Sequence, residues 1–117
     1  MSRMRTSTAA KLDQAAPVFA ALGDETRLHI VARLCGGGPL SIVQLADGAT
    51  VSRQAITKHL HALEGAGLAR SSRIGRECIW ELRTKRLSEA RRFLDQISQQ
   101  WDAALDRLRA FVEKEEH

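Results

Sequence analysis

The polar residues with the clearest binding chemistry fall within one short segment, residues 52–66. If this segment is a helix, five of its side chains share an arc of about 140°, namely Arg53, Gln54, Thr57, Lys58 and His61. Arginine, glutamine, lysine and hydroxyl groups are the side chains that pair with base edges and phosphates. Ser52 is the expected N-cap and borders the same surface. The segment is therefore predicted to bind double-stranded DNA.

A second basic element follows in a predicted β-hairpin at residues 69–82. LARSSR and ECIWEL read as two short strands, joined at residues 74–76. Arg73 and Arg76 lie at its tip, placed to reach a phosphate or the minor groove. Residues 52–76 hold five Lys and Arg against the single acid Glu64, and the other charges of the chain cancel. The net charge of +4 is thus confined to this stretch, as in a polyanion-binding surface.

The polar arc has a second interpretation, because the same residue types occur on any solvated helix face. Helical periodicity does not separate the two interpretations. The adjacent basic hairpin favours nucleic-acid binding, since both elements then contribute to one positive surface. A winged-helix module that binds another protein instead of DNA is the alternative that stays open.

Four helices are expected ahead of the hairpin and one after it. The expected N-caps are Asp24, Ser41 (with Gln44 in a capping box) and Ser52. Glycines are expected to end the helices, at Gly23, residues 36–38, Gly48, Gly65 and Gly67. The first helix is expected to begin near Asp13 and to take Pro17 in its opening turn. The prediction is a mainly α fold with a small β-hairpin, ααααββα, as one domain over residues 13–117. Residues 1–12 are expected to form a disordered N-terminal tail.

A long last helix is predicted at about residues 85–115, where no glycine or proline interrupts the chain. Its apolar residues recur at spacings of three and four, as in the a/d seam of a coiled coil. One small domain cannot bury such a seam, so we expect a homodimer. The predicted interface residues are Leu87, Leu94, Ile97, Trp101, Leu108 and Phe111.

Four segments match a known family pattern: FAALGDETRLHIVARL, LSIVQLA, VSRQAITKHLHALEGAGLARSSRIGRECIWEL and QQWDAALDRLRAFV. They resemble the ArsR/SmtB family of winged-helix repressors, from about Val18 to Val112. The resemblance implies a winged helix-turn-helix homodimer, joined through its first and last helices, that represses by occupying a palindromic operator until an inducer weakens binding. It places DNA contacts at Arg53, Gln54, Thr57 and Lys58, with the wing around residues 73–76.

The metal-binding motif of many members of that family is missing. They use Cys-x-Cys at the start of the third helix, where this chain has Ser41 and Val43, which cannot replace two thiolates. A second family site uses Asp and His of the last helices, but residues 85–112 contain no histidine. We therefore predict no metal site and no cofactor, and no residue pattern identifies an inducer.

The two cysteines, Cys35 and Cys78, keep a metal- or thiol-responsive repressor as an alternative of the same fold. One ends the apolar face of a helix and the other alternates within a strand, positions where small buried cysteines are common. Buried, reduced thiols without a switching role are the simpler interpretation.

Enzymatic activity is not expected. The sequence has no nucleophile elbow, phosphate-binding glycine loop, metal-ligand cluster or isolated pair of catalytic carboxylates. It also lacks the roughly 20 apolar residues of a membrane span and the apolar stretch of an export signal. We expect a cytoplasmic protein that has no contact with a membrane.

Overall fold

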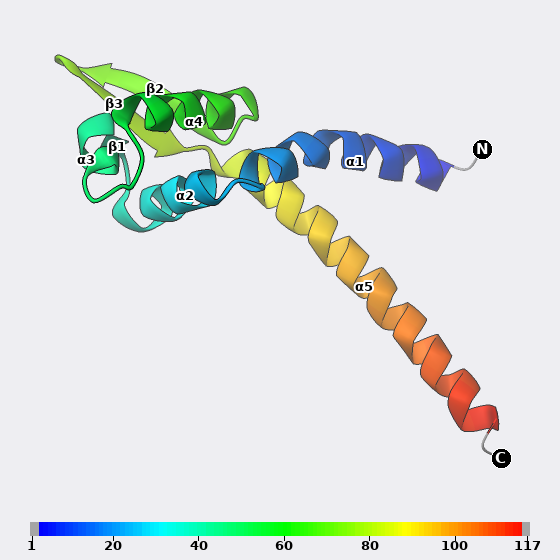
Figure 1. The fold of residues 1–117 in the computed structure, drawn as a ribbon. Coiled ribbons are helices and arrows are strands. Elements are labelled where there is room, and N and C mark those ends of the chain that lie inside the picture. Colours follow the sequence, from blue (N-terminus) through cyan, green and yellow to red (C-terminus); the bar gives the residue numbers. More distant parts are fainter. Residues whose placement is uncertain (1–2, 116–117) are drawn as a thin grey trace.

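The computed structural model describes residues 3–115, with side-chain surroundings from residue 10 onward. The elements follow one another as α1 (Arg3–Leu22), α2 (Glu25–Gly37), β1 (Leu40–Ser41), α3 (Ile42–Ala46), α4 (Arg53–Gly65), β2 (Ala69–Ile74), β3 (Glu77–Leu82) and α5 (Thr84–Glu115) (Figure 1). This order confirms the mainly α winged helix-turn-helix arrangement and adds one short strand, β1. None of the described helices is both long enough and apolar enough to cross a membrane.

Helix α1 corrects the prediction of a disordered tail over residues 1–12, because it begins at Arg3. Alanine, lysine and leucine at residues 9–12 are strong helix formers, and no glycine interrupts the helix before its end. Pro17 therefore stands inside the helix and not in its opening turn. Residues 1 and 2 of the predicted tail lie outside the described residues.

The predicted N-caps set the starts of α2 and α3. The Asp24 side chain accepts the backbone N–H of Arg27 at 3.1 Å. The Ser41 hydroxyl accepts the N–H of Gln44 at 3.2 Å, and the Gln44 side chain accepts the N–H of Ser41 at 2.9 Å. This reciprocal pair is the predicted capping box, and it stabilises a helix of only five residues that is too short to form alone.

The end of α4 turns sharply into the hairpin through Gly67, whose φ of +77° favours glycine. The N–H of Gly67 donates to the carbonyl of Glu64, and the N–H of Leu68 donates to that of Leu63, both at 2.9 Å. These two bonds form a Schellman motif, which ends the helix and sends Leu68 into the core. The predicted helix over residues 52–66 is confirmed with its caps.

The three strands form one antiparallel sheet in the order β1-β3-β2. In the hairpin, Ala69 pairs with Leu82 and Ile74 with Glu77, and Gly75 begins the tip with a φ of +64°. Strand β1 pairs with the outer edge of β3, where Leu40 lies opposite Trp80. The sheet therefore ties the segment before α3 to the hairpin.

The core of the described residues lies between α1, α2, α4 and the base of the hairpin. Its largest fully buried side chains are Val18, Ile56, Leu60, Leu63, Leu68 and Trp80. Helix α1 packs against the first turns of α5, where the rings of Phe19 and Phe93 lie 6.4 Å apart.

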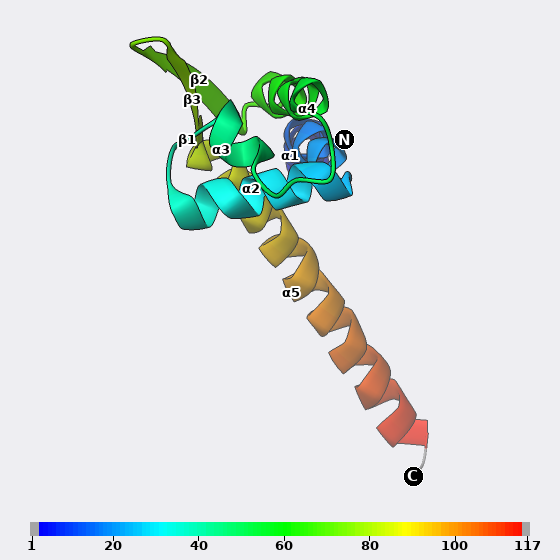
Figure 2. The ribbon, with the colours of Figure 1, turned by 60° about the vertical axis from the view of Figure 1, so that its left-hand side comes forward.

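Most of α5 projects beyond this core, and its outer half lies far from the other elements in both views (Figures 1 and 2). The radius of gyration is 19.7 Å, against about 13 Å for a compact domain of this length. The hairpin tip points away from the core in the opposite direction. The chain thus presents two separate surfaces, one around α4 and the hairpin and one along α5.

Candidate nucleic-acid interface

Helix α4 divides into a buried apolar side and an exposed polar side, as predicted. Ile56, Leu60 and Leu63 have 1% or less of their surface exposed. Of the predicted DNA-contacting residues, Thr57 is half-buried and the others are exposed: Ser52, Arg53, Gln54, Lys58 and His61, with Arg73 and Arg76 on the hairpin. The short α3, the turn after it and α4 form the helix-turn-helix arrangement, in which the second helix is the one that enters the major groove.

Two hydroxyl groups at the start of α4 are already engaged by the backbone. The Ser52 hydroxyl accepts the N–H of Ala55 at 3.1 Å, and the Thr57 hydroxyl donates to the carbonyl of Arg53 at 2.9 Å. Thr57 therefore offers a base edge only its oxygen lone pairs and its methyl group. The hydrogen bonds of the described side chains use none of the side-chain donors of Arg53, Gln54 and Lys58. These donors are therefore available for DNA.

His61 has contacts that the sequence did not reveal. Its ring stands edge-on to the ring of Trp80, with centroids 5.6 Å apart and an interplanar angle of 82°. Its Nδ1 also lies 3.4 Å from a carboxylate oxygen of Glu64. The exposed His61 side chain thus packs α4 against β3. Any contact that it makes with DNA would be additional to this structural role.

Fewer basic residues of the 52–76 stretch carry a free positive charge than the sequence suggested. Arg70 forms an ion pair with Glu81 on the adjacent strand, at their paired positions. The other four basic residues of this stretch take part in no ion pair with a described side chain: Arg53, Lys58, Arg73 and Arg76. Two belong to α4 and two to the hairpin tip, so the free positive charge of the stretch sits on the two elements predicted to contact DNA.

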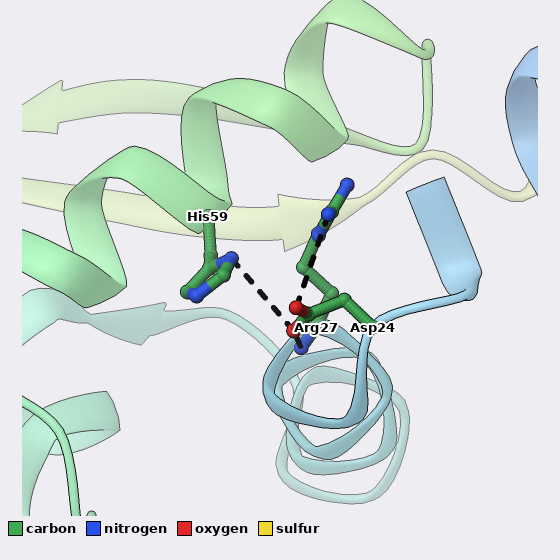
Figure 3. Close-up of polar contacts among 3 residues, drawn as sticks. All are labelled: Asp24, Arg27 and His59. Atoms are coloured by element: carbon green, nitrogen blue, oxygen red, sulfur yellow. Dashed lines mark hydrogen bonds and ion pairs between the residues drawn. The ribbon is translucent and has the colours of Figure 1, made fainter. Parts of the chain in front are cut away.

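One contact joins α4 to the start of α2 (Figure 3). The Nδ1 atom of His59 lies 3.9 Å from a carboxylate oxygen of Asp24, whose other oxygen lies 4.0 Å from the guanidinium of Arg27. The backbone N–H of Arg27 is the main cause that lowers the pKa of Asp24, helped by the positive charges of His59 and Arg27. Sequence reasoning assigned His59 no specific partner, because this contact joins residues 35 positions apart.

The predicted interface along α5 is exposed over most of its length. Trp101 has 66% and Phe111 63% of its surface exposed, and Leu94, Ile97 and Leu108 are exposed too. Leu87 differs, because it is half-buried and packs against the core of its own chain. Leu105 and Val112 are further exposed apolar residues that the a/d pattern did not include.

The positions that carry metal ligands in many ArsR/SmtB proteins have other roles here. The Ser41 hydroxyl is held in the capping box, and Val43 is an exposed aliphatic residue. Within residues 3–115, no three His, Cys, Asp or Glu side chains gather in a way that would hold a metal ion. Cys78 is half-buried, whereas Cys35 is exposed and not buried as predicted, because it follows the last buried position of α2, Leu34.

Comparison with known proteins agrees with this geometry. A family model described as a helix-turn-helix domain matches residues 22–72. The helix-turn-helix transcriptional regulator Rv2034 of Mycobacterium tuberculosis is 35% identical over 95 residues, which cover 81% of this chain and 85% of the relative.

Solved structures give the same result. An ArsR-like transcriptional regulator from Rhodococcus sp. RHA1 is 39% identical, with a TM-score of 0.75 over 87% of this chain and 95% of that one. A homodimeric winged helix-turn-helix DNA-binding domain from Mycobacterium bovis is 28% identical, with a TM-score of 0.62 over 86% and 88% of the two chains. This chain therefore belongs to the ArsR-like family of helix-turn-helix transcriptional regulators.

Proposed function

We propose that this regulator is a homodimeric repressor that binds a palindromic operator in double-stranded DNA. Each protomer inserts α4 into the major groove and lays the β2–β3 hairpin, the wing, along the adjacent backbone or minor groove. The bound dimer then excludes the transcription machinery from the operator.

The observation that carries this proposal is the distribution of free positive charge. The basic side chains of α4 and of the hairpin tip that take part in no described ion pair are exposed, and those of α4 share its polar side with the uncharged, exposed amide of Gln54. Cationic groups neutralise phosphates without reading sequence, whereas an amide donates to and accepts from a base edge. The surface therefore combines affinity and sequence recognition, as a repressor needs.

The exposed apolar side of α5 supports the dimer. Large side chains such as Trp101 and Phe111 lie along one seam on a helix that leaves its own core. A contiguous apolar stripe of this kind is costly in water and is normally covered by a partner. A second copy of the helix supplies a matching seam, and two copies place two recognition helices on two half-sites of a palindrome.

Footprinting on the DNA upstream of the gene for this protein tests the proposal. We expect protection of one palindromic site, unchanged by zinc, by a chelator or by peroxide. A change of footprint with zinc or with chelator would indicate a metal-responsive repressor, and one with peroxide would indicate a thiol-responsive repressor through the exposed Cys35. If neither this DNA nor any sequence from a random pool is bound, a protein-interaction module is the better description.

A further inference from the structure

The contact between His59 and Asp24 joins the flank of α4 to the N-cap of α2. His59 sits at the flank of α4, between the buried apolar side and the exposed polar side, and its side chain is 24% exposed. The residues one turn before and after it, Ala55 and Leu63, carry no charge. Its polar partner is therefore supplied by another element, the N-cap of α2.

A flank contact matters because apolar packing alone controls helix rotation weakly. The buried contacts of Ile56, Leu60 and Leu63 hold α4 on the core, but hydrophobic contact is not directional. A rotation of α4 by a small angle would keep much of that packing. It would also shift the side chains of Gln54 and Lys58 relative to the major groove of bound DNA. An attraction between opposite charges to one side of the axis resists this rotation, because turning the helix would lengthen the 3.9 Å separation between the two groups.

The Asp24 carboxylate is suited to this role because it is fixed and ionised. It is held by the N–H of Arg27, and its lowered pKa keeps it charged at neutral and mildly acid pH. Histidine, by contrast, gains its positive charge within the range of pH 5 to 8. The two groups therefore attract each other only while the imidazole is protonated.

The other charged groups near His59 do not replace Asp24. Among the described side chains, Asp24 is the acid within ion-pair distance of His59, while Arg27 on α2 opposes protonation of the imidazole. Helix α3 carries no ionisable residue, and on β2 Arg70 is paired with Glu81, while Arg73 lies toward the hairpin tip. On α4 itself, Glu64 faces His61, and Lys58 adds a positive charge on the polar side.

We propose that His59 is a positioning residue for DNA binding: its protonated ring pairs with Asp24 and fixes the rotation of α4, so that operator affinity rises as the pH falls from 8 to 6. The proposal rests on the DNA-binding function proposed above. It differs from a direct effect of histidine charge on DNA, which would strengthen binding to every sequence alike.

The test compares the wild-type dimer with two variants, Asp24→Asn and His59→Gln. Asparagine is as good an N-cap as aspartate, so Asp24→Asn keeps the cap of α2 and removes only the charge. The probes are a duplex selected from a random-sequence pool by the wild-type protein at pH 7 and a random duplex of equal length. Affinities are measured at pH 6 and pH 8, with sedimentation showing the same oligomeric state at both.

We expect the ratio of operator to random-duplex affinity to rise about two- to fivefold from pH 8 to pH 6 in the wild type, the size typical of a partly exposed ion pair. The rise should vanish in both variants, and it should persist in His29→Gln, which removes an exposed histidine of α2 that takes part in no described ion pair. If the affinity ratio of Asp24→Asn still rises from pH 8 to pH 6, or if the wild-type ratio does not change with pH, the proposed role of His59 is overturned. If the pool yields no selected duplex at all, the proposed DNA-binding function fails first, and the role of His59 fails with it.

Discussion

Arg33 on α2 donates from its guanidinium to the main-chain carbonyl of Leu45 at 2.8 Å. Leu45 lies in the last turn of the five-residue α3, where the carbonyls have no partner within the helix. The positive charge also offsets the partial negative charge at this helix end. One side chain of α2 therefore holds the first helix of the helix-turn-helix motif at its C-terminus.

Replacing Arg33 with Met should reveal this clamp, because methionine keeps the apolar stem and removes the donor. We expect the free energy of unfolding to fall by about 1 kcal/mol, as for one charge-assisted hydrogen bond that is only partly buried. Urea unfolding of the two proteins measures the difference. Arg91→Met, at an exposed position on α5 without a described ion pair, is the matched control and should leave stability unchanged. Equal midpoints for all three proteins would contradict the clamp.

Gln54→Ala should affect recognition of sequence and not general affinity. The exposed amide of Gln54 is suited to a base edge, and its loss should cost about 1–3 kcal/mol per half-site on the operator. Affinity for random DNA and the salt dependence should hardly change, since no charge is removed. Titrations with both duplexes measure the effect, and Gln99→Ala on α5 serves as control. An equal loss on both duplexes would mean that α4 does not read bases.

Arg76→Ala should have the opposite profile. Its side chain is exposed beside the tip of the hairpin and takes part in no described ion pair, so we expect it to neutralise a phosphate in the proposed complex. We expect weaker binding to operator and random DNA alike, with the slope of log K against log salt smaller by about one unit for each phosphate that is no longer neutralised. Arg109→Ala removes the same charge from α5. If it weakens binding as much as Arg76→Ala does, the effect comes from net charge and not from the wing.

Replacing Ile97 and Trp101 together with Asp should yield monomers. Both side chains are exposed on the seam of α5, and two buried carboxylates would face their own copies across a dimer. Sedimentation at micromolar concentration measures the oligomeric state. The control, Gln99→Asp with Ala103→Asp, adds the same charge away from the seam and should remain dimeric. A wild-type protein that sediments as a monomer would refute the assignment of α5 as an interface.

Local signals in the sequence were sufficient to predict the bounds of α4 and its exposed polar side. A serine cap, an apolar period of three to four and a glycine in the left-handed region all act within a few residues, so they can be read without tertiary contacts. The same holds for the capping box of Ser41 and Gln44. The exposed polar arc follows from these boundaries, because helix geometry fixes which side chains share a face.

Contacts between distant residues were the part that the sequence could not supply. Strand β1 exists only through pairing with β3, and a two-residue segment has no period of its own. The contacts of His61 with Trp80 and of Arg33 with Leu45 also depend on how helices and strands pack. Leu87 fits the seam by spacing, yet it lies where α5 still touches the core, so its own chain covers it.

The bare outer half of α5 has a consequence for how the regulator responds to its own abundance. In the proposed homodimer two chains must meet before either apolar stripe is covered, so scarce protein would exist as single chains, and dimers would accumulate with the square of the chain concentration. Operator occupancy then rises more steeply than the amount of protein in the cell. A twofold fall in chain concentration would therefore lower occupancy of the proposed operator by up to fourfold at low abundance, so one helix would turn a small change in expression into a sharper change in transcription.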